Sequence, residues 1–225
     1  MIKNLMRAAT AAALAVLPLA SPAPAHAHAP APAVETLLLP AAVEALPVAV
    51  EVREGYQRTS FKHWNAGKNP SDGCNTRMEV LLHEAAESPE VLPGCKLSGG
   101  LWWSYYDNKW LTSASALDVD HLVPLAEAWD SGASQWTAGR REAYANDLDE
   151  DRSLVAVSAA SNRSKADKDP AEWLPPSLDV RCRYASEWIA TKLRWGLTAD
   201  TTEREALRQL APGCPGYSVS YAPAP

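Results

Sequence analysis

Two polar segments follow short apolar runs in the middle of the chain. The segment DVDHLVP places Asp118, Asp120 and His121 at the end of an alternating run, and NRSK places Asn162 soon after a second run. Carboxylate and amide oxygens are hard ligands that suit Mg²⁺, and a neutral imidazole can take a proton from water. Together these groups have the chemistry needed for metal-assisted hydrolysis of a phosphodiester bond.

Two strands and a helix must bring these groups together. Residues 115–120 (SALDVD) and 153–158 (SLVAVS) are predicted strands, and Ser158 can cap a following helix that carries Asn162 and ends at Pro170, with Asp169 as a cap there. The end of the first strand and the first turns of this helix then face each other. Side chains alternate along a strand, so Asp118 shares a face with Asp120 and is expected to support it.

Helix signals dominate the rest of the central region. A capping box of Thr76 and Glu79 predicts a helix over 77–86, and two short helices are expected between the strands. The stretch 182–197 has one helical face at spacings of three and four and is stopped by Gly196, and 200–211 begin with a box-like arrangement of Asp200 and Glu203. The aromatic stretch 99–112 predicts a β-hairpin whose rings build core rather than stack on bases.

The same residues resemble a known family. DVDHLVP followed by NRSKADKDP is similar to the HNH, or ββα-metal, nuclease motif, including the HNH domain of the CRISPR effector nucleases. The frame over roughly 56–214 resembles secreted bacterial HNH-family endonucleases related to the C-terminal domain of GmrSD-type restriction enzymes. The resemblance implies an α+β fold in which a ββα-metal core with a short β-hairpin is embedded in a mostly helical single domain stapled by disulfides.

The resemblance also implies a role for individual residues. His121 corresponds to the general base, and Asp120 and Asn162 correspond to ligands of Mg²⁺ or Mn²⁺. The middle asparagine of the motif ties the loop between the strands to the strand that carries the base. Ser153 stands where that asparagine would be expected beside the second strand, so Asn146, the nearest asparagine, is counted with the catalytic set.

Three basic residues are candidates for contacting phosphate. Arg163 adjoins Asn162 and is counted with the catalytic groups, while Arg77 and Lys165 are predicted to bind substrate, although a solvated helix face would look the same. His83 and His63 are expected in solvent-facing or rim positions, which leaves few alternative bases.

The two ends of the chain differ in composition from the middle. Lys3 and Arg7 precede an apolar run and an A-x-A pattern, which predicts a signal peptide over 1–27 whose apolar run is too short to cross a bilayer. An Ala- and Pro-rich leader or linker over 28–53, with one short helix near 41–45, precedes the predicted nuclease domain, 54–214. Residues 215–225 are expected to be a disordered tail. We therefore expect a secreted product without a membrane span.

Cysteine usage agrees with an oxidising environment. The chain has four cysteines, an even count that suggests two disulfides with three possible connectivities. We expect the sequence-local pairs Cys74 with Cys95 and Cys182 with Cys214, because each would staple one flank of the domain. A zinc site of four thiolates is the competing interpretation, but the spacings lack C-x-x-C pairs.

Net charge limits the mode of binding. The whole chain carries −6, and removing a segment with Lys3 and Arg7 leaves −8, which argues against tight non-specific duplex binding. The sequence predicts a secreted, monomeric, metal-dependent endonuclease that acts on nucleic acid, DNA rather than RNA, and leaves 5′ phosphates. The alternative is a non-catalytic secreted or wall-associated binding module on the same scaffold.

Overall fold

The computed structural model describes residues 33–225, so the predicted signal peptide and the first residues of the leader lie outside the described part. The described residues form one compact unit. This part contains seven α-helices and eight short strands: β1 (Glu35–Leu38), α1 (Leu39–Ala45), α2 (Thr76–His83), β2 (Glu90–Leu92), β3 (Lys96–Ser98), β4 (Trp102–Ser104), β5 (Lys109–Leu111), β6 (Leu117–His121), α3 (Leu125–Asp130), α4 (Ala138–Ala145), β7 (Leu154–Ser158), α5 (Ala159–Lys165), α6 (Arg181–Trp195), α7 (Thr201–Leu210) and β8 (Ser218–Tyr221).

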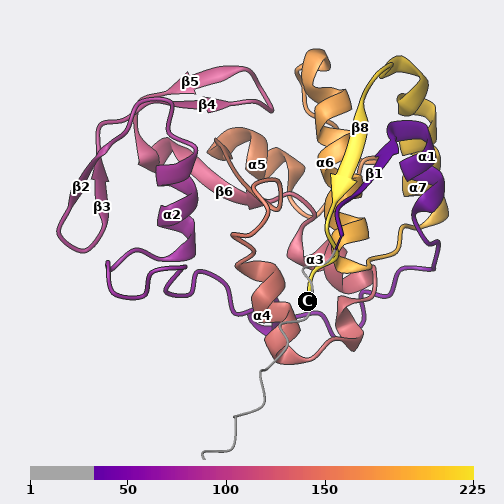
Figure 1. Ribbon diagram of the computed structural model, residues 1–225, viewed down its shortest axis with the longest axis horizontal. Helices are drawn as coiled ribbons and strands as arrows, with labels where there is room; N and C mark the ends of the chain where they lie inside the picture. The colour runs from indigo at the N-terminus through magenta and orange to yellow at the C-terminus, as the bar shows by residue number, and fades with distance from the viewer. Residues whose placement is uncertain (1–32) are drawn as a thin grey trace, which may run out of the picture. The chain divides into compact units, whose positions relative to one another are not determined.

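Strands β6 and β7 and helix α5 form the centre of the unit (Figure 1). β6 pairs antiparallel with β7, and α5 follows β7 without a loop. The Ser158 hydroxyl accepts a hydrogen bond from Ser161 N, as a capping residue should. The helix ends at Lys165, earlier than the predicted end at Pro170, because Ala166 has a left-handed φ of 52°. Asp169 accepts from Ala171 N and Glu172 N in a turn and caps no helix.

The β6–β7 pair is buried on both faces. Leu117 and Val119 point into a core shared with α2 and β4, together with Leu154, Ala156 and Trp102. Val155 and Val157, on the opposite face, pack into the larger core formed with α6 and α3. Asp118 and Asp120 pair across the ladder with Val157 and Val155, so both aspartates lie on this second face. The shared face of the two aspartates was predicted by strand alternation.

Helix α2 starts differently from the prediction. Asn75, rather than Thr76, is the N-cap, and its side chain accepts from Met78 N. Glu79 does not close a capping box, because its carboxylate accepts from Lys68 N and Asn69 N in the preceding loop. Thr76 is completely buried and donates to the side chain of Asn146 instead. The local cap is therefore Asn75, one residue before the predicted one, and Thr76 makes a tertiary hydrogen bond instead.

The predicted aromatic hairpin is present as β4 and β5, in the part of the unit that also holds α2, β2 and β3 (Figure 1). Trp102 is 1% exposed, whereas Trp103 and Trp110 are 37% and 60% exposed and pair across the strands. The hairpin therefore builds core on one face only. The hairpin β2–β3 was not predicted, since its strands are three residues long and carry no alternating pattern.

The short helix expected near 41–45 is present as α1, but both ends of the described chain hold more structure than predicted. The leader forms β1 and α1, and the tail expected to be disordered forms β8, which pairs antiparallel with β1. Val219 and Val43 are buried against α6, and Leu37 packs at their edge. Composition suggested a linker because Ala and Pro dominate locally, but the few larger apolar residues find partners more than 170 positions away.

Two disulfides staple the unit, and the described residues contain no free cysteine. They join Cys74 to Cys95 and Cys182 to Cys214, which are the predicted pairs, so the four-thiolate zinc site is ruled out. The second disulfide ties the start of α6 to the turn after α7.

As predicted, α6 ends at a left-handed glycine, Gly196. None of the described helices is long and apolar enough to cross a membrane.

Candidate functional site

A surface cleft opens where β6 ends and α5 passes beside it. Asp120 and His121 are successive residues of one strand, so their side chains leave it on opposite faces. They reach one cleft because the strand stops at His121 and the chain turns away. The residues lining the cleft are Arg58, Val119, Asp120, His121, Pro124, Leu125, Asn162, Arg163, Ala166 and Asp167. The structure therefore brings the predicted base and both predicted metal ligands to one place.

The imidazole of His121 is held in one orientation. Its Nε2 lies 2.9 Å from the carbonyl oxygen of Ala145, the last residue of α4. A carbonyl can only accept, so Nε2 carries the proton and Nδ1 keeps its lone pair. The ring of Trp64 stacks on the imidazole with centroids 5.2 Å apart, and Tyr144 lies nearly parallel to it at 6.4 Å. Burial lowers the pKa of His121 to about 3, which keeps the ring neutral.

Asn146 fixes the carbonyl that holds His121. Its Oδ1 accepts from Asn65 N and from the Thr76 hydroxyl, both at 2.9 Å. Its Nδ2 donates to the carbonyl oxygens of Lys62 and Glu142. Asn146 follows Ala145 directly, so these bonds tie the end of α4 to the segment that carries Trp64. Asn146 was predicted to tie the loop to the strand that carries the base, whereas its hydrogen bonds join the insertion to the N-terminal segment.

Asp120 is neutralised inside the protein. Lys165 Nζ lies 2.8 Å from its Oδ2 and 3.1 Å from its Oδ1, and the Tyr106 hydroxyl donates to Oδ2 at 2.7 Å. Lys165 also donates to the backbone oxygen of His121. Burial raises the pKa of Asp120 and lowers that of Lys165, while the attraction between the two groups opposes both shifts.

The predicted substrate contact of Lys165 is therefore wrong. Its side chain is 0% exposed and all of its contacts are internal. In NRSK a lysine three positions after Asn162 looks like part of a solvated helix face. Because α5 packs against β6, the side chain of Lys165 lies between the helix and the strand, where it pairs with the buried carboxylate of Asp120.

Asn162 has one end of its amide occupied and one end available. Its Nδ2 donates to Asp118 Oδ2 at 3.1 Å, which leaves Oδ1 as an oxygen ligand. Arg163 Nε lies 3.6 Å from the same aspartate oxygen, and its side chain is 76% exposed. Asp118 thus orients the amide, the supporting role that strand alternation suggested. Arg163 lines the cleft and stays free to swing towards a ligand.

Two other basic residues differ from the prediction: Arg77 lies outside the cleft, and Arg58 lines it. Arg77 was predicted to bind substrate, but its guanidinium donates to the backbone oxygen of Leu117 at 2.9 Å and so anchors the start of β6. Arg58 was not singled out, yet it is exposed and lines the cleft. Its charge is among the causes that lower the pKa of His121. No local pattern marks Arg58, because 63 residues separate it from His121.

The remaining histidines match their expected positions in part. His83 is exposed, lies 3.4 Å from Asp151 Oδ1 and does not line the cleft. His63 is half-buried, and its ring centroid is 6.3 Å from that of His121. It lies at the rim of the site, where its Nδ1 pairs with the carbonyl of Phe61.

Comparison with known proteins gives two matches. The model of the family described as "GmrSD restriction endonucleases, C-terminal domain" matches residues 61–210, a range that includes β6, β7 and α5. The chain is also similar to a protein of the fungus Arthroderma benhamiae named "Uncharacterized secreted protein", with 38% identity over 162 residues, or 72% of this chain and 77% of that protein. The likeness thus extends beyond the bacterial proteins that the motif suggested. No solved structure matches.

Proposed function

This chain belongs to the family of GmrSD restriction endonuclease C-terminal domains, and on that premise we propose that it is a secreted, metal-dependent endonuclease of HNH type. The observation that carries the proposal is the fixed tautomer of His121. Its Nε2–H is engaged by Ala145, so the free Nδ1 can act as a base in the cleft that holds Asp120 and Asn162. The order β6, β7, α5 is the order of a ββα-metal core.

The donor set fits Mg²⁺ or Mn²⁺. Asn162 Oδ1 is available, and Asp120 Oδ1 keeps a lone pair beside its bond to Lys165. One carboxylate and one amide oxygen suit an ion that retains several waters and binds substrate phosphate. Such an ion, when bound, would stabilise charge on the phosphate and on the leaving 3′ oxygen.

The chain's own groups supply the remaining steps. His121 Nδ1 takes a proton from water as the water oxygen attacks phosphorus, the bond to the 3′ oxygen breaks, and the product keeps a 5′ phosphate. Asp118 orients Asn162, and Asn146 holds the carbonyl that orients His121. Arg58 and Arg163 are the candidates for contacting the flanking phosphates. The acidic net charge of the chain predicts modest, salt-sensitive affinity, and we expect DNA to be preferred over RNA and the protein to act as a monomer.

Secretion agrees with two observations. The fungal relative is named a secreted protein, and both disulfides suit an oxidising environment. The signal peptide expected over 1–27 would provide the route.

A non-catalytic binding module is the second candidate, and one observation favours it. Lys165 already neutralises Asp120, so an ion must share this carboxylate with a buried ammonium group. One assay separates the two functions. The oxidised protein is incubated with supercoiled plasmid or with RNA, in the presence of Mg²⁺, Mn²⁺ or EDTA.

We expect metal-dependent nicking that falls at least about 100-fold in His121→Ala, since a positioned base contributes about 10²–10⁴-fold. His83→Ala is the matched control, because His83 is exposed and lies outside the cleft; it should nick at the wild-type rate. Circular dichroism checks that both variants fold. Absence of nicking by the wild type, or equal nicking by His121→Ala, would leave the binding module as the function.

A further inference from the structure

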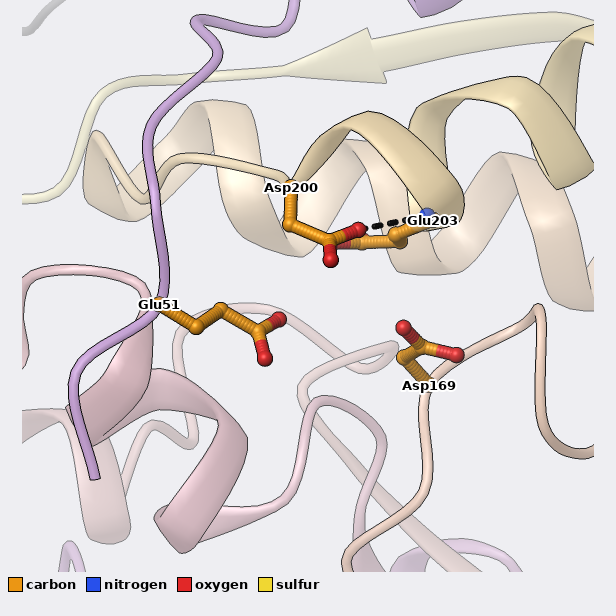
Figure 2. Close-up of side chains that lie close together, drawn as sticks. All are labelled: Glu51, Asp169, Asp200 and Glu203. Atoms are coloured by element: carbon orange, nitrogen blue, oxygen red, sulfur yellow. Dashed lines mark hydrogen bonds between the residues drawn. The ribbon is translucent and has the colours of Figure 1, made fainter.

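Four carboxylates from three separate segments meet away from the candidate cleft. They form the acidic cluster: Glu51 in the leader, Asp169 in the turn after α5, and Asp200 and Glu203 at the start of α7. One oxygen from each lies within 4.8 Å of the others, and Figure 2 shows the side chains converging. Asp200 is the N-cap of α7 and accepts from Glu203 N, and Asp169 accepts from two backbone amides. These two carboxylates are therefore held in place by local structure.

The negative charge of the acidic cluster is not balanced. Lys192 is completely buried and bridges Glu203, at 2.5 Å, and Glu127, at 2.7 Å, so one ammonium group serves two carboxylates. Arg53 is engaged by Asp130. Among the described residues, no basic side chain forms an ion pair with the other three members of the cluster.

One oxygen of the acidic cluster lacks a partner. Glu51 Oε1 and the hydroxyl of Tyr184 are the buried side-chain oxygens of the described residues that make no hydrogen bond. The carboxylate of Glu51 points towards the space between Asp169 and Asp200 (Figure 2). Tyr184 is 0% exposed, and burial, with the charges of Asp120, Asp169 and Glu203, raises the pKa of its hydroxyl. A buried oxygen without a partner carries a desolvation cost, which an occupant of this space would remove.

Apart from the ion pair with Lys192, protonation of the carboxylates lowers the negative charge of the cluster. Burial, with the neighbouring charges of Glu127 and Asp200, raises the pKa of Glu51 to about 7. Burial also raises the pKa of Asp169, and that of Glu203 to about 7. A cation would remove this cost by stabilising the ionised forms together.

We propose that the acidic cluster is a Ca²⁺ site, separate from the cleft. Ca²⁺ takes about 6–8 oxygen ligands, often several carboxylates, whereas Mg²⁺ is usually bound through one or two carboxylates and keeps several waters. Four carboxylates with oxygens within 4.8 Å of one another therefore favour Ca²⁺. The ion would join the leader, α7 and the loop that leaves α5, seven residues after Asn162.

Calorimetric titration of the EDTA-treated, oxidised protein with Ca²⁺ tests the proposal. We expect a single site with a Kd of about 10⁻⁴–10⁻³ M, the range of extracellular Ca²⁺ modules, and weaker binding of Mg²⁺. Glu51→Gln removes one ligand charge and should weaken Ca²⁺ binding at least about 10-fold. Asp200→Asn should act similarly while keeping the helix cap, because asparagine caps as well as aspartate.

Two control variants test whether Ca²⁺ binds at the acidic cluster rather than elsewhere on the protein. Glu90→Gln removes an exposed acid on β2 and should bind Ca²⁺ like the wild type. His121→Ala should also bind Ca²⁺ normally, so the Ca²⁺ site and the proposed nuclease activity can fail independently. No heat of binding in the wild type, or unchanged affinity in both Glu51→Gln and Asp200→Asn, would overturn the proposal and leave water or shared protons as the occupant.

A spectroscopic measurement on the wild-type protein tests the Ca²⁺ site even if a variant does not fold. Trp188 Nε1 donates to Glu203 Oε1 at 2.5 Å, so Tb³⁺ bound in the acidic cluster should luminesce on excitation of tryptophan. Ca²⁺ should quench this emission by displacement with the Kd found by calorimetry. Wild-type protein without a Ca²⁺-displaceable signal would contradict the site.

Discussion

The carboxylate of Asp120 and the four carboxylates of the acidic cluster differ in how their charge is balanced. Asp120 has its own ammonium, Lys165, and a tyrosine hydroxyl, so its charge is matched within the protein. The acidic cluster has four carboxylates and shares a single ammonium with Glu127. The charge of Asp120 is balanced without an ion, and that of the acidic cluster is not.

The two sites were recognised by different kinds of observation, one by a sequence motif and the other by unbalanced charge in the structure. The cleft was found by residue types and spacing, yet its carboxylate is already satisfied. The acidic cluster has no motif, because its members lie at positions 51, 169, 200 and 203, but one of its buried oxygens, Glu51 Oε1, lacks a partner. The two sites should therefore respond in opposite ways when a charge is removed.

The largest effect is expected at the balanced site. Lys165→Met leaves the charge of Asp120 buried without a counter-charge, which should cost about 3–5 kcal/mol of unfolding free energy. Urea denaturation measures the loss, and Lys168→Met, at an exposed position of the same segment, is the matched control. The double variant Asp120→Asn with Lys165→Met should recover a large part of the loss. Equal stability of Lys165→Met and the wild type would show that the ion pair does not exist in solution.

A smaller effect of opposite sign is expected at the acidic cluster. In Ca²⁺-free buffer at pH 8, Glu51→Gln removes an uncompensated charge and should stabilise the protein by roughly 1 kcal/mol, or about 2–4 °C in Tm for a chain of this size. In saturating Ca²⁺ the order should reverse, since the variant binds the ion less well. Differential scanning calorimetry with and without Ca²⁺ measures both. Destabilisation by Glu51→Gln without Ca²⁺ would remove the contrast between the two sites.

The smallest effect is a dependence on pH. The pKa of Glu51 is raised in the folded state to about 7, so its contribution to stability is complete below about pH 4.5 and is lost as the pH rises through 7. The Tm of the Ca²⁺-free wild type should therefore fall between pH 5 and pH 8, by about 2 °C more than that of Glu51→Gln. Glu84, whose pKa burial raises to about 8, acts in the same direction and accounts for a residual slope in the variant. A steeper slope in Glu51→Gln than in the wild type would contradict this assignment.

Much of the cleft was predictable because it depends on short stretches of chain. Asp120, His121 and Asn162 follow strand ends and a helix start that Ser158 caps, and alternation placed Asp118 beside Asp120. The burial of Lys165 was not predictable, because only the packing of α5 on β6 decides which face of that helix is covered. Arg58 and Trp64 enter the site from a segment that carries no motif.

The sequence by itself determined the local features: the strand ends, the caps at Ser158 and Asp200, the stop at Gly196 and the two sequence-local disulfides. These depend on residue conformational preference and on neighbours close in the chain. Only the tertiary structure decided that the leader and the tail pair as β1 and β8, that Lys165 neutralises Asp120, and that Glu51 meets Asp200. Burial and charge balance are sums over residues far apart in sequence, and no local pattern records them.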